Sequence, residues 1–283
     1  MKTSKNKRNN KAIEFYKMSG SGNDFIIIDN RDLSLNVGDL PTFARRVCKR
    51  KISVGADGLV IIEPSEKADF KWHFYNSDGS VAEMCGNASR CVARFANLKG
   101  IAAEKMSWET IAGIIGAEVK GDVVKVKLTD PSSVEAGIKI EADDQKLILD
   151  SIDTGVPHTV AFVDDIDNYD VYNIGRKIRH HKHFVPRGTN ANFASVINRN
   201  KIKVRTYERG VEDETLACGT GMVAAVLTAA QRGLVDSPTD VLVKSGETLR
   251  IYFENQKGLW KEIFLEGKVK MVYQGLLFEE AYK

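Results

Sequence analysis

The sequence predicts an α/β protein built from two similar halves. Segments rich in Val, Ile and aromatic residues alternate along the chain with segments of helical pattern. Two of the predicted helices begin directly after a Cys-Gly pair, at Cys85 and at Cys218. The spacing from the cysteine to the glycine expected to end the helix is 15 residues in both cases, reaching Gly100 and Gly233.

The residues before the two cysteines also match. Asn76 and Arg209 each stand nine residues before the cysteine, at the end of a predicted strand. Two independent loops would rarely share this arrangement. We therefore interpret the chain as an internal duplication and expect the functional site to lie between the halves.

The first half opens with two strands around a glycine-rich turn, SGSGND, followed by a helix, two strands and the helix after Cys85. These segments cover residues 12–18, 24–30, 40–51, 57–64, 70–76 and 88–100, and further strands lie within 118–131. The second half repeats this plan over residues 159–165, 169–181, 191–198, 201–210, 222–233, 239–245, 248–255 and 261–275. We expect an N-terminal domain of residues 13–129 plus 270–283 and a C-terminal domain of residues 130–269.

Composition excludes several classes of protein. The net charge of +3 comes from the first twelve residues, which carry five basic side chains; without them 36 basic residues face 38 acidic ones. The body therefore lacks the basic surface that binds nucleic acid, and we expect residues 1–12 to be a disordered leader. No apolar run approaches the roughly 18 residues that span a membrane. Four cysteines without metal-ligand spacing indicate free thiols and a cytoplasmic protein.

A cysteine at the start of a helix suggests proton-transfer chemistry. The first turn has unpaired N–H groups and the positive end of the helix dipole, which favour a thiolate and are expected to lower the thiol pKa. The glycine that follows lets a ligand approach, and the free N–H groups can hold its carboxylate. Two such thiols on opposite sides of one carbon could remove a proton from one face and return one to the other.

A single cysteine near a helix start is more often a small buried apolar residue. Cys91, six residues into its helix, and Cys48, on the apolar side of the helix over 40–51, fit that description. The duplication and the polar residues nearby distinguish Cys85 and Cys218 from them.

Five motifs carry a resemblance to a known family. They are MSGSGNDF (18–25), NSDGSVAEMCGNASRC (76–91), PH (157–158), TNANF (189–193) and ERGVEDETLACGTG (208–221). With these motifs in this order, the chain from about Phe15 to Phe278 resembles the diaminopimelate epimerases, which are cofactor-independent amino-acid epimerases. The resemblance implies that each half is a mixed, mostly antiparallel sheet curled around a central helix, with the active site in the cleft between them.

The resemblance also implies the roles of individual residues. Cys85 and Cys218 would be the two acid/base residues, with His158 and Glu208 close enough to tune them. Four residues would bind the amino acid, much of the set at its far carboxylate and amine: Asn23, Asn76, Asn190 and Arg209. The α-carboxylate would lie against Gly86, Asn87, Gly219 and Thr220. The family uses neither pyridoxal phosphate nor a metal ion, so we expect no cofactor, and it implies a homodimer that acts on a small amino acid.

The residue types agree with these roles, although each has a plainer interpretation. Arginine binds carboxylates with two hydrogen bonds, but Arg209 could instead form a surface ion pair with Glu208 or Glu212. Asparagine offers a donor and an acceptor to a zwitterion, but it is also common in turns. A lone histidine such as His158 is more often structural.

Three departures from the family pattern stand out. Val156 occupies a position where the family commonly has Asn, which would help to hold the distal carboxylate. Ala88 replaces a usual Gly, which should be harmless in a helix. The acidic pair Glu212–Asp213 stands where many members have a shorter turn.

We therefore expect an epimerase that interconverts LL- and meso-diaminopimelate for lysine and peptidoglycan synthesis. A related two-cysteine racemase acting on another amino acid, such as histidine, is the first alternative. A thiol redox or binding protein of the same fold is the second. If the thiols face each other, oxidation should join Cys85 to Cys218 and stop activity.

Overall fold

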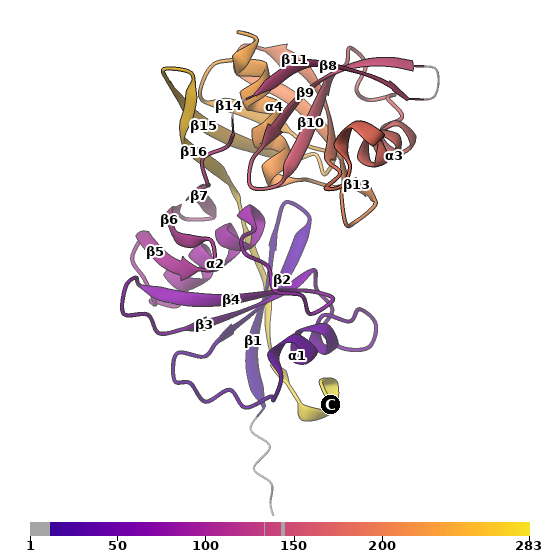
Figure 1. Ribbon diagram of the computed structural model, residues 1–283. Coiled ribbons are helices and arrows are strands. Elements are labelled where there is room, and N and C mark those ends of the chain that lie inside the picture. The colour runs from indigo at the N-terminus through magenta and orange to yellow at the C-terminus, as the bar shows by residue number, and fades with distance from the viewer. Residues whose placement is uncertain (1–11, 133, 143–144) are drawn as a thin grey trace, which may run out of the picture.

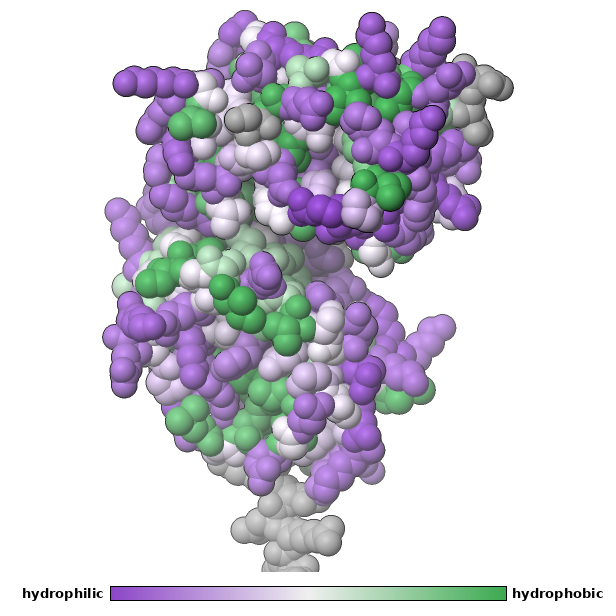
Figure 2. Space-filling model, in the orientation of Figure 1, coloured by the Kyte–Doolittle hydropathy of each residue, from purple (hydrophilic) through white to green (hydrophobic). Residues whose placement is uncertain are grey.

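The computed structural model describes residues 12–132, 134–142 and 145–283, so the predicted leader lies outside the described residues except for Ala12. Figure 1 shows two bodies, one formed mainly by the first half of the chain and one by the second, with the last strand returning to the first body. Figure 2 shows a mostly hydrophilic surface, with less polar residues gathered at the junction of the two bodies.

Within the described part of the chain, the first body contains eight strands and two helices. In chain order its elements are β1 (Ile13–Gly20), β2 (Asn23–Asp29), α1 (Leu40–Val47), β3 (Gly58–Glu63), β4 (Phe70–Asn76), α2 (Gly86–Leu98), β5 (Lys105–Thr110), β6 (Gly113–Lys120), β7 (Val123–Lys127) and, from the C-terminus, β17 (Lys270–Leu277). The 3-10 turn η2 (Glu279–Ala281) follows β17.

The second body contains the remaining elements. They are β8 (Glu135–Ala142), β9 (Gln145–Asp153), β10 (Pro157–Phe162), α3 (Val171–His180), η1 (Lys182–Phe184), β11 (Asn190–Asn198), β12 (Lys201–Glu208), β13 (Asp213–Thr215), α4 (Gly219–Gln231), β14 (Thr239–Leu242), β15 (Thr248–Gln256) and β16 (Leu259–Lys268).

Strand pairing repeats between the two bodies. In the first, β1–β2 is antiparallel, β2–β3 parallel, β3–β4 antiparallel, β4–β5 parallel, and β5–β6 and β6–β7 antiparallel. In the second, the same order of directions runs through β9–β10, β10–β11, β11–β12, β12–β14, β14–β15 and β15–β16. The antiparallel pair β7–β16 joins the two series. The predicted duplication is therefore confirmed, and the two copies meet at equivalent strands.

One helix lies at the centre of each body. The helices α2 and α4 both have 13 residues, begin directly after a cysteine and bury most of their side chains. Helix α4 carries apolar residues on all sides, as expected for a helix enclosed by a sheet. Helix α2 contacts β1, β2, β6 and β7, which lie at opposite ends of its strand series, so the sheet curls around it as predicted.

The ends of both central helices are also as predicted. Gly100 and Gly233 have positive φ angles of 65° and 68°, and their N–H groups bond to Asn97 and Ala230 in the last turn. Glycine adopts this conformation without a steric penalty and satisfies a carbonyl that the helix leaves free.

The shorter helices α1 and α3 cover the outer faces of the sheets. Helix α1 packs in a cluster with β1, β2 and β3, and α3 packs in a separate cluster with β8, β10, β11 and β12. Asp39 and Asp170 cap their first turns by accepting hydrogen bonds from the backbone N–H groups three residues further along the chain.

Two kinds of sequence expectation were wrong. The helix predicted over 40–51 ends at Val47, because Cys48 caps it and Gly55 and Ala56 bond back to Val47 and Cys48. Four strands, β5, β8, β9 and β13, were not predicted. In β8 the buried residues Ile138, Ile140 and Ala142 alternate with exposed ones, a period-two signal between charged residues that was available in the sequence.

Candidate active site

Cys85 and Cys218 occupy the same position in the two bodies. Each is the N-cap residue of its central helix, with extended backbone and with a side chain that makes no capping hydrogen bond. No close capping bond occupies the first turn, although the N–H groups of Asn87, Ala88 and Gly221 lie near enough to the sulfurs to lower their pKa. Cys218 is buried and Cys85 half-buried.

The two helix starts meet across β16. A Cβ atom added to Gly86 would lie 3.0 Å from Leu265 Cδ2, and one added to Gly219 would lie 3.5 Å from the same atom. The Gly219 position is also 4.0 Å from Asn87 Oδ1 of the other body. The charges of the two thiols act on each other as well, and the Glu208 carboxylate acts on both. The structure therefore brings together the two Cys-Gly segments that the sequence singled out.

Burial governs the protonation of the thiols. It raises the pKa of both, whereas the sequence led us to expect a lowered pKa. The backbone N–H groups of Ala88 and Asn87 do lower the pKa of Cys85, as expected for a helix start, but by less than burial raises it. For Cys218 burial and the Glu208 carboxylate raise the pKa, and contacts with Thr220 and Gly221 oppose them. The Thr220 hydroxyl lies 3.6 Å from the Cys218 sulfur.

Glu208 contacts the second thiol, and His158 lies in the same body. Glu208 is the last residue of β12, and burial raises the pKa of its carboxyl although contacts with Thr215 and Cys218 oppose the rise. His158, the second residue of β10, is fully buried. Burial lowers the pKa of its imidazole to about 3, the positive charge of Arg209 adds to the effect, and the hydrogen bond with Asn192 opposes it. His158 is therefore neutral at physiological pH.

In the first body a chain of polar contacts lies behind Cys85. Asn87 Nδ2 donates to Asn23 Oδ1 at 2.6 Å, and Asn23 Nδ2 donates to Asp57 Oδ2 at 3.1 Å. The Asn87 amide oxygen accepts from Arg90 Nη2 at 2.7 Å, and the same guanidinium nitrogen bonds to Ser21 Oγ at 2.9 Å. Two predicted binding residues, Asn23 and Asn87, are thus held together by their side chains.

Arg90 is unusual because its guanidinium is fully buried and bonds no carboxylate among the described residues. Its partners are Asn87, Ser21 and the carbonyl of Lys268. Gly267 leaves room for it, because a Cβ there would lie 2.5 Å from Arg90 Nη1. The positive charge lowers the pKa of Cys85 and so favours its thiolate.

In the second body Asn190 and Arg209 are linked. Asn190 Oδ1 accepts from the backbone N–H of Arg209 at 2.8 Å, and Asn190 Nδ2 donates to the Pro157 carbonyl at 3.2 Å. The Arg209 guanidinium donates to the Arg187 carbonyl at 2.8 Å. The alternative of an ion pair between Arg209 and Glu208 or Glu212 does not occur among the described ion pairs.

In the ranges that the structure describes, Asn76 connects to the other predicted residues only through the backbone. It is the exposed last residue of β4, and its side chain donates to Ser80 Oγ at 3.0 Å. The next residue, Ser77, donates its N–H to the Asp57 carbonyl, and the Asp57 side chain bonds Asn23. A ligand contact of Asn76 remains a prediction.

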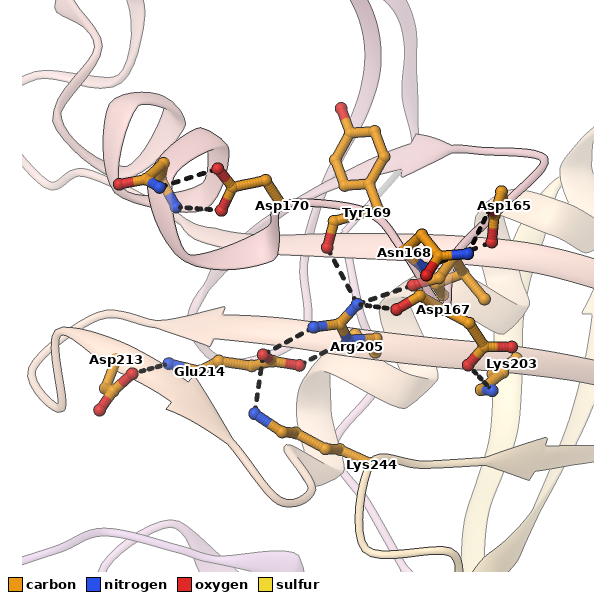
Figure 3. Close-up of polar contacts among 12 residues, drawn as sticks. Asp165, Asp167, Asn168, Tyr169, Asp170, Lys203, Arg205, Asp213, Glu214 and Lys244 are labelled. Atoms are coloured by element: carbon orange, nitrogen blue, oxygen red, sulfur yellow. Dashed lines mark hydrogen bonds and ion pairs between the residues drawn. The ribbon is translucent and has the colours of Figure 1, made fainter.

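The segment that leads into Cys218 is fastened by Arg205 (Figure 3). This arginine of β12 bonds both carboxylate oxygens of Glu214 in β13, at 2.6 and 2.9 Å, and the carbonyls of Ile166 and Tyr169. Lys244 adds a third bond to Glu214 at 2.8 Å. Bidentate bonds of a half-buried arginine fix geometry well, so β13 is held firmly four residues before the thiol.

The acidic pair Glu212–Asp213 now has a structural explanation. Glu212 turns the chain between β12 and β13 with a positive φ of 58°, and its carboxylate accepts from Gly210 N at 3.0 Å and Arg179 Nε at 3.1 Å. Glu212 therefore ties this turn to the end of α3, and Asp213 accepts from the backbone N–H of Glu214 at 2.7 Å. For Val156, which is half-buried, the structure offers only a backbone bond from Thr154 N at 3.2 Å.

The other two cysteines are buried apolar residues, as predicted. Cys48 is 2% exposed and Cys91 is fully buried, and burial raises the pKa of each to about 12. All four cysteines are free thiols. Within residues 12–132, 134–142 and 145–283, no group of His, Cys, Asp and Glu is arranged to hold a metal ion. None of the helices in these ranges is long and apolar enough to cross a membrane.

Several residues that support the site were missed in the sequence. Asp57 holds Asn23, Arg90 holds Asn87, and Asn192 holds His158. Arg90 and Asn192 stand inside the quoted motifs, and charged or polar residues within an otherwise apolar helix or strand were the available signal.

Comparison with known proteins agrees with the geometry. A family model described as diaminopimelate epimerase matches residues 15–134 and 151–272. A diaminopimelate epimerase of Aquifex aeolicus is 48% identical over 95% of this chain and 99% of its own length. One of Hydrogenobaculum sp. is 46% identical over 94% and 99%, and one of Archaeoglobus fulgidus is 42% identical over 94% and 96%.

Solved structures of lower identity share the fold. A PhzF-family phenazine biosynthesis protein of Bacillus anthracis aligns with a TM-score of 0.72 at 15% identity, over 95% of this chain and 99% of its own. A hydroxyproline epimerase of Agrobacterium vitis aligns with a TM-score of 0.65 at 16% identity, over 96% and 94%.

Proposed function

Because the chain belongs to the diaminopimelate epimerase family, and is thus an isomerase, we propose that it inverts one α-carbon of 2,6-diaminopimelate by proton transfer between Cys85 and Cys218. The observation that carries this mechanism is the meeting of two equivalent helix starts at Leu265, each with a free thiol at its N-cap. One thiolate removes the α-proton, and the opposite thiol delivers a proton to the other face.

The substrate's two ends would be bound by different groups. The α-carboxylate lies against the first-turn N–H groups of Gly86, Asn87, Gly219 and Thr220, where the helix dipoles favour an anion. The distal carboxylate and ammonium contact Asn23, Asn76, Asn190 and Arg209. The Arg209 side chain, anchored to the Arg187 carbonyl, supplies the cation that the carboxylate needs.

Burial serves this reaction by making the thiolate a stronger base. The raised pKa of both thiols means that few molecules carry a thiolate, but each thiolate holds a proton more tightly once formed. The two sulfurs titrate together, because the charge on one disfavours the charge on the other. Closure of the two bodies around the substrate would keep water from the carbanion.

Deuterium exchange tests the proposal. Incubation with LL-diaminopimelate in D2O should place deuterium at an α-carbon, measured by mass spectrometry. Cys85→Ser and Cys218→Ser should each slow the conversion of LL to meso isomer by a factor of about 100 or more, since each removes an acid/base group. Cys91→Ala, which alters a thiol of the same helix outside the site, is the matched control and should keep its activity.

Other outcomes would identify the alternatives. Exchange with histidine but not with diaminopimelate would indicate a related racemase, in which Val156 has changed the distal pocket. Absence of exchange with any amino acid under reducing conditions would indicate a thiol redox or binding protein. Full activity of either Cys→Ser variant would overturn the two-thiol mechanism.

We also propose that the protein works as a cytoplasmic homodimer, in lysine and peptidoglycan precursor synthesis, with domains at residues 13–129 plus 270–283 and 130–269. The pairing of β17 with β1 supports these boundaries. Free thiols support a reducing compartment. Strand β17 exposes Val272 and Leu276 by 54% and 58%, an apolar edge that a second copy would cover. Analytical ultracentrifugation tests the dimer.

A further inference from the structure

Asn192 lies between His158 and Thr206, beside the start of α4, and the proposed reaction assigns it no role. It belongs to β11 and is 1% exposed. Its amide nitrogen is 3.1 Å from His158 Nδ1 and 2.8 Å from the Thr159 carbonyl oxygen, and its amide oxygen is 2.9 Å from Thr206 Oγ1. Gly221 leaves it room, because a Cβ there would overlap the Asn192 oxygen.

These contacts determine how the amide is oriented. A backbone carbonyl only accepts hydrogen bonds, so the Asn192 atom beside Thr159 must be the NH2 group. The reverse orientation would place two oxygens against each other. The oxygen then faces the Thr206 hydroxyl, which donates to it.

The orientation of the amide in turn determines the tautomer of His158. One hydrogen of the NH2 group bonds to the Thr159 carbonyl, and the other points to His158 Nδ1. A ring nitrogen that accepts a hydrogen bond carries no proton, so the single proton of neutral imidazole is on Nε2. That nitrogen is buried and has no hydrogen-bond partner among the described residues.

We infer that Asn192, oriented by Thr159 and Thr206, is a positioning residue that keeps His158 in its Nε2–H form, so that the imidazole acts in the site as a hydrogen-bond donor and not as a base. A buried donor without a partner is costly, and this one gains a partner when an anion forms or binds beside it.

Two anions of the proposed reaction could accept this bond, so this inference rests on the proposed function. One is a carboxylate of the substrate, which Arg209 would hold. The positive charge of Arg209 acts on His158. The other is the thiolate of Cys218, at the same helix start: a Cβ added to Gly221 would lie 3.3 Å from Cys218 Cβ and would also reach Asn192. Both are anionic acceptors, and kinetics can separate them.

The tautomer can be measured without activity. Long-range ¹H–¹⁵N correlation spectra of the uniformly ¹⁵N-labelled protein at neutral pH distinguish protonated from bare ring nitrogens, and His158→Gln assigns the signals. We expect Nδ1 bare and Nε2 protonated in the wild type. Asn192→Asp should move the proton to Nδ1, because a carboxylate only accepts, and Asn192→Leu should leave a mixture. Thr228→Val is the control. It removes a buried polar group that bonds to the backbone of α4, and it should change neither signal.

The kinetic constants then identify the acceptor. Asn192→Leu should reduce kcat/KM by about tenfold or more, the usual effect of losing a hydrogen bond to a charged group. A rise in KM alone assigns the bond to the substrate carboxylate, and a fall in kcat assigns it to the thiolate. Wild-type His158 protonated on Nδ1, or a tautomer unchanged in Asn192→Asp, would overturn the inference whether or not the protein is an epimerase.

Discussion

At the scale of single residues, burial drives the ionisable groups of the site toward their neutral forms. It raises the pKa of Cys85, Cys218 and Glu208, and it lowers the pKa of His158. All four shifts have the same cause, since a charge is poorly stabilised away from water. Burial lowers the pKa of the Arg90 guanidinium too, but arginine starts from so high a pKa that it keeps its proton. Its charge favours the thiolate of Cys85 over that of Cys218, which stands beside Glu208.

The burial of His158 predicts a loss of stability in acid. Its pKa is about 3 in the folded protein and near 6.5 in the unfolded chain, so between these values only the unfolded chain takes up the proton. Stability should therefore fall as the pH drops from 6.5 toward 3, by about 1.4 kcal/mol per pH unit from this residue. Urea unfolding at about pH 6.5 and 4.5 measures it. The loss between these two conditions should be smaller by roughly 2–3 kcal/mol in His158→Gln; an equal loss in both proteins would contradict the buried neutral state.

At the scale of elements, the first turn of α4 contains two glycines with different steric surroundings. Gly219 has only ordinary contacts, because the nearest atom would lie 3.5 Å from a Cβ added there. Gly221, two residues later, stands against the amide of Asn192 and the hydroxyl of Thr206. Gly221 is therefore required because Asn192 of β11, which supports His158, lies against it. Gly219 leaves space for the ligand that the helix start would bind.

This difference predicts opposite effects of two alanine substitutions in one helix turn. Gly221→Ala should destabilise the protein by about 1–3 kcal/mol, because the methyl group displaces Asn192 in a packed core. Gly219→Ala should be neutral or stabilising by about 0.5–1 kcal/mol, because alanine favours the helix and has space. Thermal or urea unfolding of both variants gives the comparison. Equal stabilities would show that Asn192 moves aside at no cost.

At the scale of the whole molecule, the pseudo-symmetric arrangement places the two thiols. Each body builds the same strand order around its own helix, and β7 pairs with β16 so that equivalent strands join. The side chain of Leu265, on β16, therefore touches both helix starts. A reaction that needs the same group on both faces of one carbon is well served by a duplicated chain with this symmetry.

The same arrangement predicts sensitivity to oxidation. Without substrate between them, Cys85 and Cys218 should form a disulfide on treatment with a mild oxidant, with loss of activity and recovery by a reductant. Peptide mass mapping under non-reducing conditions identifies the pair, and the fully buried Cys91 should keep its free thiol. Full activity after oxidant treatment, with both thiols still free, would count against their closeness.

Much of this architecture could be predicted from local sequence. The Cys-Gly pairs, the glycines that end the two helices and the polar residues at the strand ends are signals of short range, and the structure has the duplication and helix ends that they indicate. Strand β8 was missed because charged residues dominate its exposed positions, and β13 because a strand of three residues is too short to show a period.

What the sequence alone determined is therefore the repeat, the fold class and the residues placed at the helix starts, because capping and periodicity depend on neighbours in the chain. The tertiary structure decided the direction of the thiol pKa shifts, the neutrality of His158 and the link from Thr206 through Asn192 to its ring. Those properties depend on how much water reaches a side chain and on which strand lies against it. Burial and cross-strand contacts arise from residues far apart in sequence, which no local pattern records.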